Sequence, residues 1–113
     1  MYVSINQVIA GIFQPYDYES VTVADTAIGL TAAKYKDAGS IDSNSQRGAS
    51  RVVITVETAG LRYRYDGTDP TAAEGHILNA NDVIVLVGPD AIRMFRGIRT
   101  TGTSAVLKCT YER

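Results

Sequence analysis

Residues 51–77 read RVVITVETAGLRYRYDGTDPTAAEGHI, and this stretch contains two runs rich in β-branched and aromatic residues. In the first run Val52, Ile54 and Val56 fall on one side, as expected for a strand with one buried face. In the second run apolar and aromatic side chains alternate with arginines: Leu61, Arg62, Tyr63, Arg64 and Tyr65. Gly60 lets the chain reverse between the runs, so we predict a β-hairpin with both tyrosines packed in the core.

Turn residues set the end of the second run. Asp66 and Gly67 supply a turn with positive φ at low steric cost. Pro70 then keeps Asp69 out of the helical region of backbone space. The strand is therefore expected to stop at this point, with the rest of the chain packed on the hairpin as further strands.

Length and composition narrow the class of protein. A chain of 113 residues with 45% hydrophobic residues suits one domain with one core. The net charge of −1 predicts no bulk attraction to nucleic acid or to anionic lipid. A single cysteine leaves no internal disulfide and no cysteine-based zinc site. Neither a run of about 18 apolar residues nor the basic segment of a signal peptide is present.

The first 15 residues are expected to form an N-terminal arm, followed by a single domain over residues 16–113. The apolar residues of the arm fit either a short strand or a helical turn, because they follow no single period. An arm this apolar is expected to pack on its own domain or on a neighbouring subunit. Its candidate contact residues are Val3, Ile5, Val8, Ile9 and Phe13.

The remaining stretches predict short strands separated by turns. Residues 18–30 fit two short strands or one bent strand, and residues 34–50 are polar and small, as in a loop. We treat residues 36–50 as a candidate contact loop or a mobile one, because the connection is unusually long. Residues 83–87 are apolar at every position, which is typical of a strand covered on both faces, in a sandwich or at a subunit contact.

Two strands close the chain. Residues 92–98 are predicted as a strand with arginines interleaved, and residues 104–111 as the last strand, with Leu107, Cys109 and Tyr111 on its apolar side. Short strands with turn signals at roughly ten-residue spacing indicate an all-β fold. We predict a small β-sandwich, or a jelly-roll-like barrel, with an extended N-terminal arm.

The residues that carry reactive groups have simpler structural interpretations. His76 is the only histidine, and a turn beside a strand accounts for it and for Glu74 nearby. Cys109 lies on the apolar side of the last strand, which favours a buried thiol. Four carboxylates do not have the spacing of a calcium loop: Asp66, Asp69, Glu74 and Asp82. We expect no enzyme activity, no bound metal and no cofactor.

Five of the 11 basic residues are arginines on two predicted strands: Arg62, Arg64, Arg93, Arg96 and Arg99. If the two strands are neighbours, these side chains form a stripe. The simpler interpretation is a solvated sheet face on which arginines pair with acids. The functional interpretation is an interface, because arginine forms bidentate pairs and is enriched at contact surfaces.

Three segments together resemble a known family: VTVADTAIGLT (21–31), LRYRYDGTDPTAAEGHIL (61–78) and FRGIRT (95–100). With a last strand that ends in Thr-Tyr, they look like a family of small proteins encoded among the structural genes of tailed bacteriophages and prophages. The resemblance runs from about Tyr18 onward and leaves out the arm. It implies a virion component, made in the bacterial cytoplasm and assembled in many copies, with no catalytic residues.

A second, shorter resemblance concerns residues 63–71. The pattern Tyr-x-x-Asp-Gly-Thr-Asp-Pro-Thr is similar to a hairpin motif of immunoglobulin-like modules appended to chitin- and hexosamine-degrading enzymes. It supports a β-sandwich more than it supports sugar binding.

The leading expectation is a capsid decoration or cement protein, trimeric, that stabilises the shell through protein contacts. The arm and the apolar strand would face sister subunits, and the 36–50 loop or the arginines would face the major capsid protein or other virion proteins. One alternative is a tail or head–tail connecting component. The other is a carbohydrate-binding module for host attachment, with exposed aromatics such as Tyr16, Tyr18 and Tyr35. Neither nucleic acid nor membrane is an expected partner.

Overall fold

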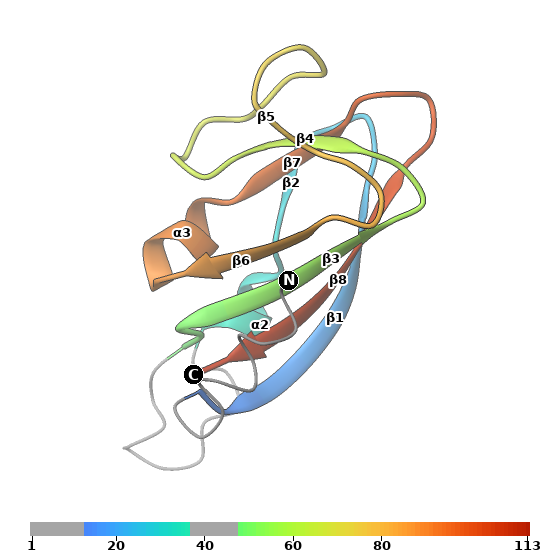
Figure 1. Cartoon of the computed structure of the whole chain (residues 1–113). Coiled ribbons are helices and arrows are strands. Elements are labelled where there is room, and N and C mark those ends of the chain that lie inside the picture. Colours follow the sequence, from blue (N-terminus) through green and yellow to red (C-terminus); the bar gives the residue numbers. More distant parts are fainter. Residues whose placement is uncertain (1–12, 37–47) are drawn as a thin grey trace.

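The computed structural model describes residues 13–36 and 48–113, which fold into a small all-β sandwich of two antiparallel sheets (Figure 1). The first sheet has the order β1 (Pro15–Val23), β8 (Ala105–Glu112), β3 (Arg51–Glu57) and β6 (Val83–Val87). The second has the order β2 (Ile28–Gly29), β7 (Arg96–Arg99), β4 (Leu61–Arg64) and β5 (His76–Leu78). Two short helices accompany the strands, α2 (Ala32–Tyr35) and α3 (Pro89–Met94). The predicted all-β sandwich is confirmed.

The core lies between the two sheets and is built mainly on β3 and β8. Their inward side chains are fully buried in two matched rows: Val52, Ile54 and Val56 on β3, and Leu107, Cys109 and Tyr111 on β8. The alternation that predicted these two faces is therefore confirmed. Leu61 from β4 and Phe95, just before β7, cover the rows from the second sheet.

The predicted hairpin between residues 51–57 and 61–65 is wrong. β3 pairs with β8 and β6, whereas β4 pairs with β7 and β5, so the two runs lie in different sheets. The chain changes sheets at a tight corner, where Thr58 has a φ of 79°. A Cβ atom on Gly60 would lie only 3.0 Å from the carbonyl oxygen of Leu78, so the corner favours a glycine. Alternation correctly gave the buried faces, but a corner and a hairpin share that pattern.

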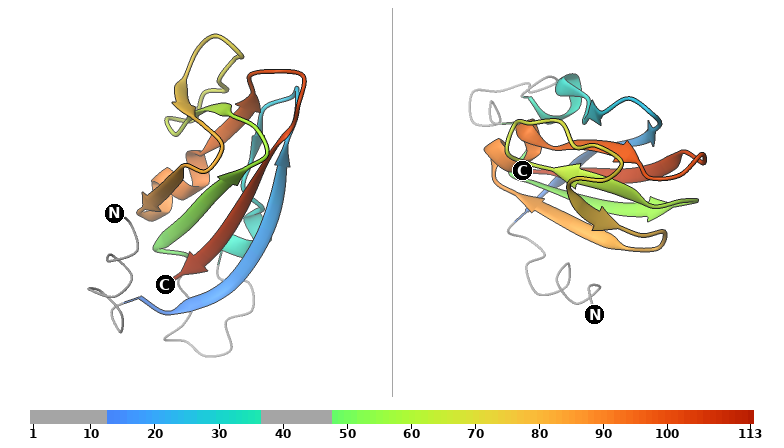
Figure 2. Two further views of the ribbon diagram at one scale, coloured as in Figure 1. Left: turned by 45° about the vertical axis from the view of Figure 1, so that its right-hand side comes forward. Right: turned by 90° about the horizontal axis from the view of Figure 1, so that it is seen from above.

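Residues 83–87 form a strand as predicted, but not one in the middle of the sandwich. β6 is the last strand of the first sheet, and in the view from above it lies at the margin of the molecule (Figure 2). Val83 and Val87 are 38% and 65% exposed, and Leu86 is the only fully buried residue of the five. The alternative, that this strand meets another subunit, stays a prediction.

The strand predicted over residues 92–98 is wrong in its first half. Pro89 begins helix α3, where its missing N–H costs nothing, and the helix continues to Met94. Ile92 and Phe95 turn into the core, each 1% exposed, so the apolar residues that suggested a strand face belong to a helix and its end. β7 begins only at Arg96, and Arg93 lies on the helix.

The first strand begins inside the segment that was predicted as an arm. β1 begins at Pro15, and Gln14 exchanges two backbone hydrogen bonds with Arg113, of 2.7 and 3.0 Å. Paired backbone thus extends two residues into the segment predicted as an arm. Residues 18–30 contain two strands, one in each sheet, which matches one of the two expected arrangements. Four predicted arm contacts lie outside the described residues: Val3, Ile5, Val8 and Ile9.

We predict that Ile54→Ala lowers the free energy of unfolding by about 2–5 kcal/mol, because it leaves a cavity between the sheets. Urea unfolding followed by circular dichroism measures the change. Thr55→Ala, on the opposite face of the same strand, is the matched control and should cost about 1 kcal/mol or less. A loss below about 0.5 kcal/mol for Ile54→Ala would contradict the placement of this side chain in the core.

Candidate contact surfaces

The hydrogen-bond phase of β6 follows from two backbone bonds that flank its pairing with β3. Gly88 donates to the carbonyl of Ser50 at 2.7 Å, and Val56 donates to the carbonyl of Asp82 at 2.9 Å. Each of these two bonds joins a residue pair one step beyond an end of the ladder. The first and last pairs of the ladder are therefore non-hydrogen-bonded pairs. The two kinds of pair alternate along an antiparallel ladder, so the phase of every residue in β6 is fixed.

This phase leaves one side of β6 open. Ile84 and Leu86 direct their N–H and C=O groups toward β3, whereas Val83, Val85 and Val87 direct theirs away from the sheet. In the described part of the chain no strand lies beyond β6 on that side. Three valines therefore present a row of backbone donors and acceptors at the margin of the sandwich. We call this row the β6 edge.

A shallow groove of about 300 Å³ runs beside the β6 edge and is lined by aliphatic and aromatic residues. Its walls are Tyr63, Tyr65, Ile84, Val85, Leu86, Val87 and Ala91. Tyr63, one of these walls, stacks on Phe95, with ring centroids 5.6 Å apart. The predicted burial of Tyr65 is wrong, because β4 ends at Arg64 and the Tyr65 ring lies beyond it, 50% exposed, against Tyr63.

The β6 edge lacks the features that protect most exposed strands. Natural edges carry lysines, prolines or bulges, or they are very short. β6 consists of five branched aliphatic residues with regular pairing to β3. An apolar edge with free backbone groups is suited to pairing with another strand, which makes it the strongest candidate contact surface among the described residues.

The arginine stripe is only partly formed. Because β4 and β7 are neighbours, Arg64 lies opposite Arg96, and Arg62 lies opposite Ile98, on the outer face of the second sheet. Arg99 lies opposite the buried Leu61 and so belongs to the other face. Arg93, on α3, pairs with Asp90 of the same helix at 2.8 Å. The structure thus brings together three of the five predicted arginines.

These three arginines hold the loop of residues 66–75 against their own sheet. Arg62 donates to the carbonyl of Gly75 at 2.7 Å, Arg64 pairs with Asp66 at 2.6 Å, and Arg96 pairs with Asp69 at 2.7 Å. The hydrogen bond from Arg64 also holds the pKa of the exposed Asp66 below its usual value. This arrangement agrees with the simpler interpretation, and an interface role for these side chains stays a prediction.

Phe13 is the one predicted arm contact within the described residues, and it packs on its own domain. The guanidinium carbon of Arg51 lies 4.2 Å from the centre of the Phe13 ring. Arg51 also pairs with Glu112 across β3 and β8, and both residues are less than 5% exposed. The sequence analysis missed this buried pair, because opposite charges 61 residues apart carry no local signal.

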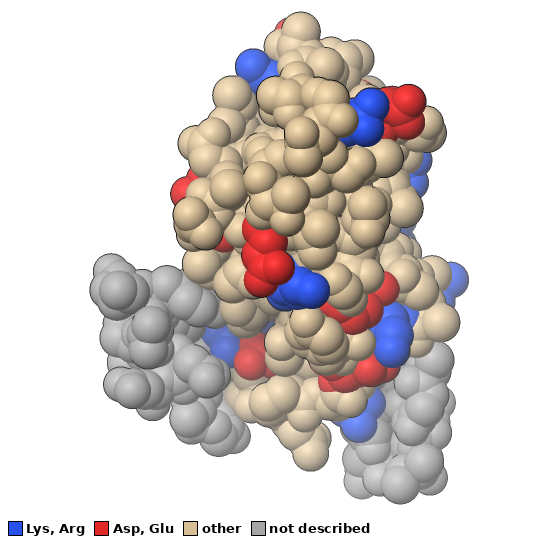
Figure 3. Space-filling view, turned by 90° about the vertical axis from the view of Figure 1, so that its right-hand side faces the viewer, with Lys and Arg blue, Asp and Glu red and all other residues tan. Residues whose placement is uncertain are grey.

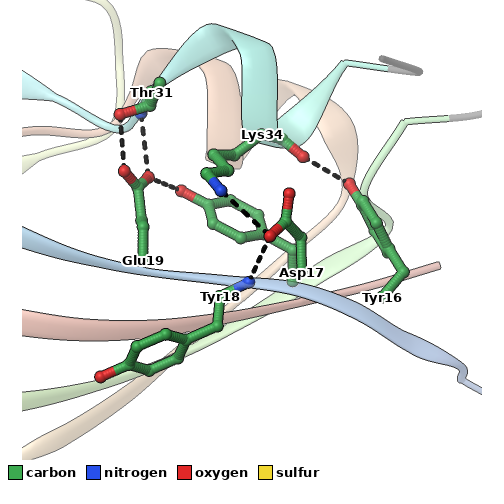
Figure 4. A network of polar contacts seen from close by, with 7 residues as sticks. Tyr16, Asp17, Tyr18, Glu19, Thr31 and Lys34 are labelled. Carbon is green, nitrogen blue, oxygen red and sulfur yellow. Dashed lines mark hydrogen bonds and ion pairs between the residues drawn. The ribbon is translucent and has the colours of Figure 1, made fainter. Parts of the chain in front are cut away.

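A polar network ties β1 to the segment around α2 (Figure 4). Glu19 accepts hydrogen bonds from the backbone and the hydroxyl of Thr31, at 3.1 and 2.6 Å, and from the hydroxyl of Tyr111. Asp17 pairs with Lys34 at 3.0 Å. Burial, and the bond to Glu19, raise the pKa of Tyr111. The sequence did carry a signal for this network: Glu19 lies two residues before the inward Val21, so the two side chains share one face of β1.

The three tyrosines expected for carbohydrate binding do not share one exposed face. Tyr16 donates to the carbonyl of Lys34 at 2.7 Å, and Tyr35 packs against the core. Tyr18 is 53% exposed and projects from the opposite side of β1 from Asp17 (Figure 4).

Of the groups considered for chemistry, Asp66, Glu74 and His76 line one shallow hollow, whereas Cys109 lies apart from them in the core. His76 is exposed beside Tyr63 and Tyr65, with ring centroids 5.3 and 6.1 Å away. Cys109 is fully buried, and burial raises the pKa of its thiol to about 12. Over residues 13–36 and 48–113, no three side chains of His, Cys, Asp or Glu gather in a way that would hold a metal ion.

The charged side chains are mixed in sign where Figure 3 shows them. On this side of the molecule acidic and basic groups lie next to one another, and neither sign forms a continuous patch. Among the described helices, none has the length and apolar character to cross a membrane.

Comparisons with known protein families, with curated proteins and with solved structures found no match for the chain.

We predict that Cys109 does not react with a thiol reagent at pH 8 in the folded protein. With a pKa of about 12, only about one thiol in 10⁴ is ionised at that pH, and the side chain has no access to solvent. In urea the same thiol should react completely, which serves as the control in an absorbance assay. Rapid labelling of the native protein would contradict the buried placement.

Proposed function

We propose that this chain is a structural protein of a tailed-phage virion, and that it acts as a capsid decoration protein. The observation that carries the proposal is the β6 edge, an apolar strand whose outward backbone groups pair with no other strand of the described residues, beside a groove lined by aliphatic and aromatic residues. A protein that works through contacts needs such a surface. The resemblance of residues 21–31, 61–78 and 95–100 to phage structural proteins supplies the virion as the setting.

The chemistry of the surface favours protein partners. Burying apolar area contributes about 25 cal/mol for each Å², and a strand edge adds directional backbone hydrogen bonds. The arginines of the second sheet are already engaged with their own loop, so the β6 edge is the surface that gains most from a partner. The partners in this proposal are sister subunits at the β6 edge and the major capsid protein, or another virion protein, at other surfaces.

Many copies suit weak individual contacts. A shell-coating protein binds a lattice of identical sites, so modest contacts between copies add to the affinity of each copy for the shell. In this proposal the chain is made in the bacterial cytoplasm and ends in the virion. The alternative is a tail or head–tail connecting component, in which copies close into a ring; there the β6 edge would have to meet a different surface of the next copy, because a ring needs a heterologous contact.

A carbohydrate-binding role is the second candidate, and the surroundings of Tyr65 favour it. The half-exposed Tyr65 ring lies beside His76, and a shallow hollow between them is also lined by Arg64 and Asp66. An aromatic face with polar neighbours is an arrangement that can hold a sugar ring. A glycan array tests this role, and loss of binding in Tyr65→Ala would support it.

We predict hundreds of copies of the chain in each purified virion, counted by quantitative mass spectrometry. Added protein should also bind capsids that lack it and raise their resistance to heat. A count of about six, twelve or a few tens would replace decoration by the tail or connector role. Absence from virions would overturn the whole proposal.

A further inference from the structure

The sequence of β6 is complementary to itself. Val83-Ile84-Val85-Leu86-Val87 has a branched aliphatic residue at every position, and it has nearly the same character read in either direction. We infer that two copies of this chain pair through their β6 edges, antiparallel and about a twofold axis at Val85. The inference concerns the free protein, so it does not depend on the virion.

The outward backbone groups fit this arrangement. Val83, Val85 and Val87 all direct their N–H and C=O groups away from β3, which is what a hydrogen-bonded pair with a new strand requires. With the axis at Val85, that residue bonds Val85 of the partner subunit, and Val83 bonds Val87 of the partner subunit. Each pair of this type exchanges two hydrogen bonds, and none of the groups involved is taken from the ladder with β3.

The charges around β6 also permit a twofold contact. In a twofold contact, residues near the axis lie against the same residues of the partner subunit, so a charge there would face a like charge. β6 carries no charge over its whole length. The nearest acid, Asp82, lies beyond the paired stretch and falls opposite Gly88 of the partner subunit in this register.

The side chains of the two β6 strands would meet on the outer face of the first sheet. Val83 and Val85 lie beside Thr55 and Val53 on that face, through their pairing with β3. Valine opposite valine is a favourable cross-strand pair, because branched side chains pack well on a pleated surface. The pairing joins two four-stranded sheets into one continuous sheet, which spans both subunits.

The other edges of the described sandwich do not offer the same opportunity. β1 has a register shift near its start, where Pro15 lies, and it carries Asp17 and Glu19. These features discourage pairing at an edge. In the second sheet the edge strands β2 and β5 have only two and three residues. Within the described parts of the chain, β6 is therefore the long edge without protection.

The symmetry of this contact is specific. Pairing of identical strands through one edge is isologous, so it produces a closed dimer and not a ring. The trimer expected for a decoration protein would need a different surface. A dimer is also the arrangement in which both free edges disappear at once, which leaves no strand for a third copy.

Analytical ultracentrifugation over a wide range of protein concentration tests the inference. The wild-type protein should sediment at low concentration with the 12.2 kDa mass of one chain and at high concentration with twice that mass. A single species at the mass of one chain throughout, or a trimer, would overturn the inference.

Two substitutions at the axis locate the contact. Val85→Pro removes an outward N–H without removing a bond to β3, and Val85→Lys places like charges on either side of the axis. Each should raise the dissociation constant of the dimer by about tenfold or more. Thr22→Lys, at an exposed position on the other edge of the sheet, is the control and should dimerise as the wild type does.

The outcomes separate this inference from the proposed function. Dimers that persist unchanged in both Val85 variants would overturn the β6 contact. Urea unfolding checks that each variant is folded. If the proline variant does not fold, Val85→Lys still provides the test. A monomer present in hundreds of copies on virions would overturn the dimer and leave the decoration role standing. A dimer absent from virions would do the reverse.

Discussion

The structure depends on the packing of two inward rows of side chains on adjacent strands, β3 and β8. Ile54 lies opposite Cys109, and the two rows are fully buried on the side that faces the second sheet. Such a surface cannot be left in water, so a second layer has to cover it. The second sheet is that layer, and the corner at residues 58–60 carries the chain directly from β3 into it. Polar ties then fix the margins, with Glu19 bound to the hydroxyl of Tyr111.

A sandwich built in this way always leaves sheet edges, and the protein treats its edges differently. β1 is irregular and acidic at its start, and the edges of the second sheet are very short. β6 alone is regular, apolar and open over its five residues, within the part of the chain that the structure describes. Protein edges of this kind are normally blocked, because they promote association. An open one therefore supports the proposal that this protein works through association with other chains.

Alternation along the sequence predicted which side chains face the core, because a strand has a period of two whatever its partners are. It could not predict which strands pair, and the corner at Thr58 looked like a hairpin for that reason. The same limit applies to Val83–Val87, since an apolar run fits a central strand and an open edge equally well. Tyr65 was placed in the core because the alternation continued past the end of β4. The buried pair of Arg51 and Glu112 joins residues far apart in the sequence, so it needed the structure.

The open edge is the central claim, and hydrogen exchange of the β6 amides, followed by NMR, tests it most directly. Exchange reports whether each N–H has a partner, one residue at a time. The account predicts an alternating pattern in dilute protein, with Ile84 and Leu86 slow and Val83, Val85 and Val87 fast. At high concentration the three valines should become slow as well, because a partner strand then covers them. Equal protection of all five amides in dilute protein would contradict the claim, since it would mean that the β6 edge is already paired within a single chain.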